Sequence, residues 1–155
     1  MRRSFALLTL ALGLIAASCG QSVDFSEKAD IPGSFKLYES PSGVSFAVPK
    51  ALGEAKPVDG DTVRFGDETA FVELQTRAGK GDGFEGYVRS YETVATTLGK
   101  AKVEITEQEV PGAEAARLFE IVSPPKKNAN AAELRSRVLI VRRGGDVLVL
   151  SAGTQ

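Results

Sequence analysis

Short segments with β-strand patterning fill most of the chain beyond residue 34. FKLYES (35–40) and VSFAVP (44–49) are joined through SPSG (40–43), whose residue types favour a turn, so we predict a β-hairpin. DTVRF (61–65) and AFVELQT (70–76) form a second predicted pair. Apolar and polar positions alternate in the latter, which is typical of a half-buried strand.

Four further segments continue the β pattern toward the C-terminus. AKVEITEQEV is followed by a turn at Pro111-Gly112 and then by AARLFEIV, and LRSRVLIVRR is joined to DVLVLSAGTQ through Gly144-Gly145. A Gly-Gly pair between two β-rich runs is typical of a hairpin. VLIV and VLVL are continuous apolar runs, which predict central strands with both faces covered.

One segment, residues 83–98, has the periodicity of a helix. Asp82 is its expected N-cap, with Glu85 as capping-box partner, and Gly99 stands at its expected C-terminal end. Its apolar residues fall on one stripe of a helix with 3.6 residues per turn: Phe84, Tyr87, Val88, Tyr91, Val94, Ala95 and Leu98. We expect Tyr87 and Tyr91 to lie in the core with their hydroxyl groups at its edge. Strands with one inserted helix predict an α+β fold with an antiparallel sheet and at least one packed helix.

The N-terminus has the pattern of an export signal. Arg2 and Arg3 precede an apolar run of about a dozen residues, which is short for a membrane-spanning helix. Small residues then lead to Cys19, and Ala16-Ala17-Ser18-Cys19 resembles the lipobox of bacterial lipoproteins. The resemblance implies cleavage between Ser18 and Cys19 and lipidation of Cys19. An ordinary secretory signal and an uncleaved anchor helix are the alternatives.

The cysteine content and the charge agree with a lipoprotein. Cys19 is the single cysteine, so no internal disulfide can form, and lipidation would account for it. We predict a signal peptide at 1–18, a lipidated tether at 19–34 and one domain at 35–155. Removal of residues 1–18 also removes both N-terminal arginines, leaving 17 basic and 20 acidic residues, so nucleic acid is not an expected partner. The predicted location is the extracytoplasmic side of a membrane, with attachment through the lipid.

The segment GDGFEG (81–86) matches the glycine fingerprint G-x-G-x-x-G of dinucleotide-binding proteins. That fingerprint needs a buried parallel strand before it and further βαβ units after it. Here the preceding strand is half polar, four residues separate it from Gly81, and the chain that follows is nearly all strand. We therefore interpret the glycines as a loop and a helix start, and expect no cofactor.

The sequence contains few of the residue patterns that catalytic sites use. The chain has no histidine, which excludes Ser-His-Asp and Cys-His nucleophile systems, and G-x-S-x-G is absent. Four carboxylates cluster in or beside predicted loops: Asp59, Asp61, Asp67 and Glu68. Their spacing is not that of a calcium-binding EF-hand, so we interpret them as solvated turns and expect neither a metal site nor enzymatic activity. A glycosidase with two carboxylates stays open, because its acid and base can be far apart in sequence.

The order of elements resembles the Mog/PsbP-like fold and, within it, the LpqN-type lipoproteins of actinobacteria. The resemblance covers about residues 35–153 and is carried by Tyr38-x-x-Pro41-x-Gly43-x-x-Phe46-x-x-Pro49, Gly112-x-x-Ala115-Ala116-Arg117-Leu118 and the closing VLVLSAG. It implies a PsbP-like sandwich and a binding or accessory role, and it carries over no functional residues. Members of this family usually continue into a C-terminal helix that packs on the sheet, whereas this sequence ends at Gln155.

That difference suggests that the sheet face opposite helix 83–98 is exposed and apolar. Such a face would bind a protein partner, a second copy or a hydrophobic ligand. The equal alternative is that the sequence is a shortened or degenerate copy of a longer gene. The function we expect is that of a membrane-anchored extracytoplasmic binding or accessory module without catalysis. The alternatives are a small exported carboxylate-dependent hydrolase and a carrier of a hydrophobic ligand.

Overall fold

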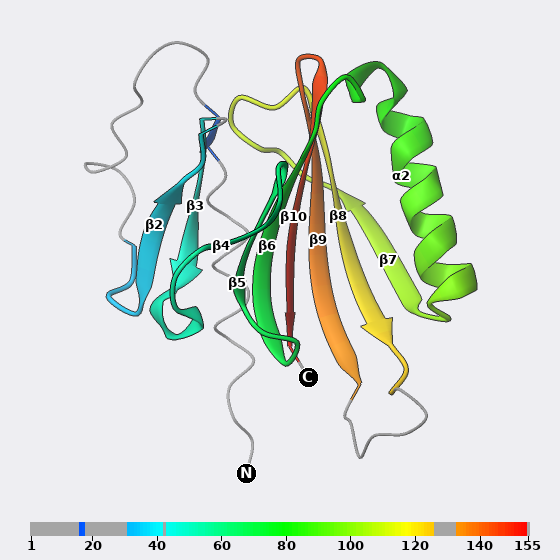
Figure 1. Cartoon of the computed structure of the whole chain (residues 1–155). Helices are drawn as coiled ribbons and strands as arrows, with labels where there is room; N and C mark the ends of the chain where they lie inside the picture. Colours follow the sequence, from blue (N-terminus) through cyan, green and yellow to red (C-terminus); the bar gives the residue numbers. More distant parts are fainter. Residues whose placement is uncertain (1–15, 18–30, 42, 126–132, 155) are drawn as a thin grey trace.

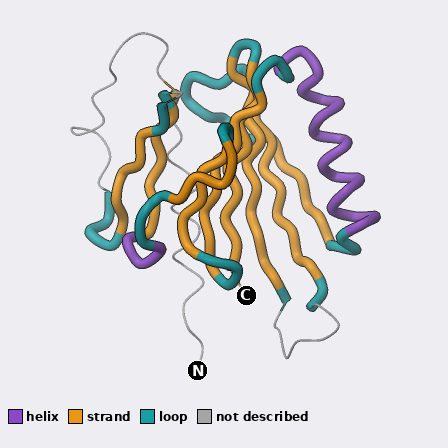
Figure 2. The backbone as a smooth tube through the Cα atoms, viewed as in Figure 1, coloured by secondary structure: helices purple, strands orange, loops and turns teal. Residues whose placement is uncertain are grey.

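The computed structural model describes residues 16–17, 31–41, 43–125 and 133–154, and its main feature is a seven-stranded antiparallel sheet. In spatial order the strands are β4 (Lys56–Asp59), β5 (Thr62–Gly66), β6 (Ala70–Arg77), β10 (Asp146–Thr154), β9 (Leu134–Arg143), β8 (Ala115–Ser123) and β7 (Lys102–Glu107). Each neighbouring pair runs antiparallel. The predicted α+β class is confirmed (Figures 1 and 2).

The apolar runs VLIV and VLVL lie where the sequence places them, in the neighbouring inner strands β9 and β10. Val138 to Val141 and Val147 to Leu150 are all buried. Side chains of consecutive residues in a strand point to opposite faces. A continuous apolar run is therefore stable only where both faces of the sheet are covered.

One face is covered by helix α2 (Phe84–Thr93), preceded by the 3-10 turn η4 (Gly81–Gly83) and followed by the π-helical turn η5 (Val94–Leu98). The helix begins after Gly83 without a side-chain cap, so the expected capping box of Asp82 and Glu85 is wrong. Glu85 instead accepts a hydrogen bond from Arg117 Nη2 at 3.0 Å.

The helix buries less of its predicted stripe than expected. The side chains that pack in this layer as a buried cluster are Phe84, Val88, Phe119, Ile121, Val138, Ile140, Val147 and Val149. Val94 and Leu98, however, are 55 % and 77 % exposed. The π turn hydrogen-bonds five residues apart, as from the Gly99 N–H to the Val94 carbonyl (3.0 Å), so side chains beyond Thr93 leave the 3.6-residue spacing. The left-handed residue after the helix is Lys100, with φ 51°, and not Gly99.

The opposite face is covered by the hairpin of β2 (Phe35–Glu39) and β3 (Val44–Pro49), to which the two-residue strand β1 (Ala16–Ala17) is paired. The short 3-10 turn η3 (Lys50–Leu52) follows the hairpin. Figure 1 shows the hairpin and α2 on opposite sides of the sheet. Val44, Phe46 and Val48 of β3 share a buried cluster with side chains of β5, β6, β8, β9 and β10.

The exposed apolar face expected from the sequence is therefore wrong where the hairpin packs. Phe46, Phe65 and Tyr38 make edge-to-face contacts with centroid distances of 5.1 to 6.2 Å across this layer. The sequence shows the hairpin but not its place, because the same pattern suits a strand pair that extends the sheet and one that packs on its face. Within the described ranges, no helix has the length and apolar character needed to cross a membrane.

Candidate functional site

The face of the sheet that carries the hairpin changes from apolar to charged along the strands. Residues in register across β7, β8, β9 and β10 form rows, each containing one residue per strand. The row nearest the core is Thr106, Leu118, Leu139 and Leu150. The next row is Glu104, Glu120, Arg137 and Ala152, and the last is Lys102, Val122, Arg135 and Thr154.

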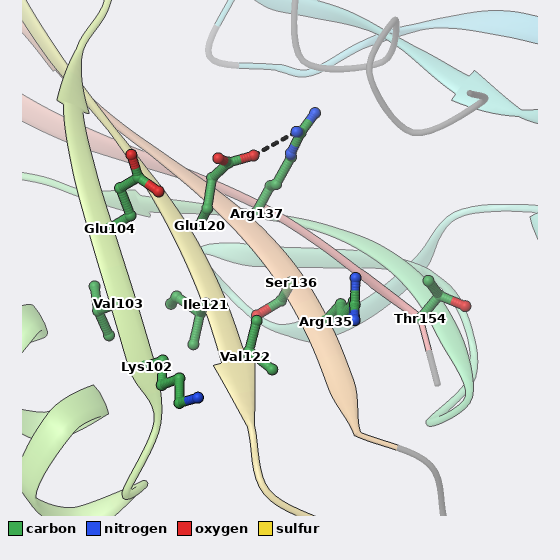
Figure 3. A pocket seen from close by; sticks show the side chains of 10 residues that line it. All are labelled: Lys102, Val103, Glu104, Glu120, Ile121, Val122, Arg135, Ser136, Arg137 and Thr154. Carbon is green, nitrogen blue, oxygen red and sulfur yellow. Dashed lines mark ion pairs between the residues drawn. The ribbon is translucent and has the colours of Figure 1, made fainter. Parts of the chain in front are cut away.

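All residues of these two charged rows except Ala152 line a groove of about 540 Å³, together with Val103, Ile121 and Ser136. Figure 3 shows Glu104, Glu120 and Arg137 close together, with Lys102, Val122, Arg135 and Thr154 nearer the strand ends. Lys102, Glu104 and Arg135 are exposed, and Glu120, Val122 and Arg137 are half-buried. The groove is thus open to water, and five of its ten lining residues are charged.

Two glutamates face each other in this groove. Glu104 of β7 lies directly opposite Glu120 of β8, an arrangement in which like charges destabilise the strand pair. Arg137 of β9 forms an ion pair with Glu120 and offsets this repulsion. Glu104 has no ion-pair partner among the described residues, so its charge is available to a binding partner.

Both carboxylates of the groove are accessible to water. A pair of carboxylates performs acid–base hydrolysis when their environments keep one protonated and one ionised. In this groove Glu120 forms an ion pair with Arg137, and Glu104 is exposed to water.

A second cavity lies at the end of the helix. It has a volume of about 240 Å³ and is lined by Tyr91, Val94, Ala95, Gly99, Ala101, Ile121, Ser123 and Ser136. Most of these side chains are apolar. The volume is below the range of roughly 300–1,000 Å³ typical of small-molecule sites.

Tyr91 connects this cavity with the core. Its ring makes an edge-to-face contact with Phe119 at a centroid distance of 5.2 Å, and Tyr87 also packs against the same cluster. Burial, followed by the negative charge that Tyr87 would acquire, raises the pKa of Tyr91 above 10.0, although a hydrogen bond with Ser151 acts in the other direction. The expectation that both tyrosines pack into the core is confirmed.

The carboxylates singled out in the sequence lie in or beside turns, as we expected. Asp59 Oδ1 accepts a hydrogen bond from the Asp61 N–H (3.0 Å) in the turn between β4 and β5. Asp67 Oδ1 accepts from the hydroxyl of Thr69 at 2.6 Å and from its N–H at 2.8 Å, and these bonds lower the pKa of Asp67. Among the described residues, no group of three or more Asp, Glu, His or Cys side chains is arranged to bind a metal.

The glycines of GDGFEG have a structural explanation. The Gly81 N–H donates to the Gly145 carbonyl at 3.0 Å, which ties the start of the helix to the β9–β10 turn. The preceding strand β6 is antiparallel to both of its neighbours. The fingerprint's parallel βαβ setting is therefore absent from the described sheet, and the interpretation of these residues as a loop and helix start is confirmed.

The predicted site of signal cleavage and lipidation lies outside the described residues. This applies to Ser18, to Cys19 and to the signal peptide at 1–18 apart from Ala16–Ala17. The groove, by contrast, was missed by sequence reasoning. Its only signal is a charged residue at every second position in KVE (102–104) and RSR (135–137), and the strand register is needed to bring these residues together.

No protein-family model matches the chain, and neither does any curated protein. Among solved structures, the chain is similar to a crystal structure of a protein of unknown function from Pseudomonas aeruginosa. The two are 20 % identical with a TM-score of 0.48, over 79 % of this chain and 84 % of that one. This similarity is too low to support a function. The resemblance to the PsbP-like fold stays a prediction from the sequence.

Proposed function

We propose that the protein is a lipid-anchored, extracytoplasmic bacterial lipoprotein whose domain binds a ligand and catalyses no reaction. The observation that carries the anchoring is the single cysteine, Cys19, placed after a basic start, an apolar run and small residues. Two or more acyl chains attach a protein stably to a membrane, so anchoring needs no spanning helix.

The mass of the protein tests the anchoring. We expect the intact mass of the membrane-extracted chain to match cleavage before Cys19 plus acyl chains. Cys19→Ser removes the thiol that is alkylated, and it should therefore remain uncleaved or be cleaved elsewhere without a lipid. An unmodified wild-type mass would overturn the lipoprotein proposal and favour a secreted protein or an uncleaved anchor.

The charged groove supports the binding part of the proposal. Its two charged rows place basic and acidic groups on β7, β8 and β9, and rigid strands hold such groups in fixed positions. The ligand that fits it is charged, with an acidic group facing Lys102 and a basic group facing Glu104. Charge complementarity of this kind determines the specificity and the rate of association more than the affinity.

A photo-reactive amino acid in the groove tests whether it is occupied in the cell. We choose Val122, which lies between Lys102 and Arg135 in the outer row, and use the exposed Val58 of β4 as the matched control. We expect a cross-linked adduct of defined mass from Val122 and none from Val58. Equal labelling at both positions, or labelling at neither, would contradict binding in the groove.

The alternative of an exported hydrolase has one favourable observation, the opposed carboxylates Glu104 and Glu120. If they were catalytic, Glu104→Gln and Glu120→Gln would each abolish turnover of a substrate found by screening glycosides. The carrier alternative needs an apolar pocket that encloses its ligand, and the cavity at the helix end is small for that role.

A further inference from the structure

The two outer strands of the seven-stranded sheet differ in how their edges are protected. β4 has four residues, contains Pro57, and shifts its register between Pro57 and Asp59. A short strand, a proline and a bulge are the devices by which proteins prevent edge-to-edge association. β7 has six residues, contains no proline and keeps one register with β8 along its whole length.

The outer side of β7 is open. Among the described residues, β7 pairs only with β8, and no other backbone hydrogen bond involves residues 102–107. Its outward N–H and C=O groups therefore form a template for a further strand. Val103 and Ile105 pack toward the helix layer, whereas Lys102, Glu104 and Thr106 are exposed on the groove face.

Two charges of β7, those of Lys102 and Glu104, are not compensated by its inner neighbour, whereas Glu107 forms an ion pair with Arg117 of β8. Lys102 is opposite Val122, and Glu104 is opposite another glutamate, Glu120. A strand added antiparallel on the outer side would compensate both, provided that it placed an acidic residue opposite Lys102 and a basic one opposite Glu104. The positions opposite Val103 and Ile105 would have to be apolar, because they face the helix layer.

The chain itself contains this pattern. When two copies of β7 run antiparallel with Val103 opposite Val103, Lys102 of each copy faces Glu104 of the other and Ala101 faces Ile105. Moving the centre of the pairing to residue 104 would oppose Glu104 to Glu104, and moving it to residue 105 would leave both charges opposite neutral residues. Charge complementarity thus selects one register, and that register has two-fold symmetry.

An apolar patch borders the same part of β7. The turn η5 contacts β7, and Leu98 lies four residues before Lys102 in the sequence. Four large apolar side chains are exposed in the described chain, and two of them, Val94 and Leu98, are in η5. Exposed apolar groups beside an open strand edge are expected at a surface that another protein covers.

We propose that the protein forms an isologous dimer through β7, paired about Val103, with Val94 and Leu98 of each copy packed at the rim. The two sheets become one continuous sheet, and the two charged grooves adjoin across the dimer axis. A contact of about five residues on each edge is small for a stable dimer in solution. Anchoring of both copies in one membrane would strengthen it by raising their effective concentration.

Charge reversal tests the register. We would measure the dimer dissociation constant of the full-length chain in detergent by sedimentation, which does not depend on whether the chain is lipidated. Lys102→Glu and Glu104→Lys each create two like-charge pairs and should each weaken the dimer roughly tenfold. The double variant, Lys102→Glu with Glu104→Lys, restores two opposite-charge pairs and should recover the wild-type value. Single variants that dimerise like the wild type, or a double variant that fails to recover, would overturn the proposal.

Site-specific disulfides give a second measurement that also detects a weak dimer. In a Cys19→Ser background, chains carrying Lys102→Cys are mixed with chains carrying Glu104→Cys. The two positions are directly opposite in the proposed register, so the mixture should cross-link faster than either chain alone. Equal rates in all three samples would contradict the register.

Mutations in the apolar patch complete the test. Leu98→Ser should weaken the dimer, and Leu37→Ser, at an exposed position of the hairpin, should leave it unchanged. A dimer that is insensitive to Leu98→Ser but sensitive to Leu37→Ser would place the interface on the hairpin and overturn the proposal. Failure of the lipoprotein proposal would be recognised separately, from the intact mass of the same preparation.

Discussion

Gly81 lies against Gly144 so closely that a Cβ atom at residue 81 would be 2.4 Å from the Gly144 carbonyl oxygen. The contact joins the start of the helix to the turn of the central hairpin, β9–β10. Both partners are backbone, so neither a rotamer change nor a small side-chain movement relieves the overlap. The glycine at 81 is therefore required by the close approach of two backbones.

Gly81→Ala should destabilise the protein by roughly 1–3 kcal/mol, the usual effect of overpacking. Gly86→Ala is the matched control, because Gly86 lies within α2 and nothing is within 4 Å of its Cβ position. That change should stabilise the protein by about 1 kcal/mol through helix propensity. Urea unfolding of both variants measures the difference. Equal effects would show that the contact at Gly81 does not constrain the fold.

The hairpin contributes a large part of the core through Phe46. This side chain is fully buried between Tyr38 and Phe65, and Phe46→Ala should cost about 3–5 kcal/mol. Leu37→Ala, at a 42 % exposed position of the same hairpin, should change the stability by less than about 0.5 kcal/mol. Increased binding of a hydrophobic dye by Phe46→Ala, but not by Leu37→Ala, would show that the hairpin covers the sheet face. A small effect of Phe46→Ala on stability would contradict that role.

The raised pKa of Tyr91 predicts a loss of stability at alkaline pH. The folded state holds the proton above 10.0, the ordinary pKa of tyrosine, whereas the unfolded chain releases it there. The contribution of Tyr91 is thus fully present below pH 10 and is lost as the pH rises through the higher folded value. Tyr91→Phe should remove this part of the pH dependence. Ultraviolet titration of the phenol groups should likewise lose its latest-titrating tyrosine in that variant.

Arg137 should be needed to hold two glutamates on adjacent strands. Arg137→Gln removes the partner of Glu120 and leaves it opposite Glu104, which should cost roughly 0.2–1 kcal/mol. Glu104→Gln removes the repulsion and should recover most of that loss when the two changes are combined. Chemical unfolding of the two single variants and the double variant measures the coupling. Additive effects would show that the three charges do not interact.

Apart from β4 and the two-residue β1, which were missed, the strands, their pairing into hairpins and the class of the fold could be predicted from the sequence, because each depends on local periodicity and turn chemistry. The helix was also predictable, but its ends were not. The capping box of Asp82 and Glu85 was wrong because Glu85 forms an ion pair with Arg117, a residue 32 positions away. The exposure of Val94 and Leu98 could not be predicted because it depends on a π turn, and the spacing of the apolar residues does not reveal such a turn.

By itself, the sequence determined that a domain with an antiparallel sheet and one helix follows a lipobox-like segment ending at Cys19. Only the tertiary structure decided which faces are covered, because the place of the hairpin depends on contacts between β3 and strands far along the chain. It also decided where the charges meet. Lys102, Glu104, Glu120, Arg135 and Arg137 come from three strands, and a shift of one residue in register would turn a strand's side chains to the other face. The groove and the open edge of β7 are therefore properties of the register, which no single segment of the sequence contains.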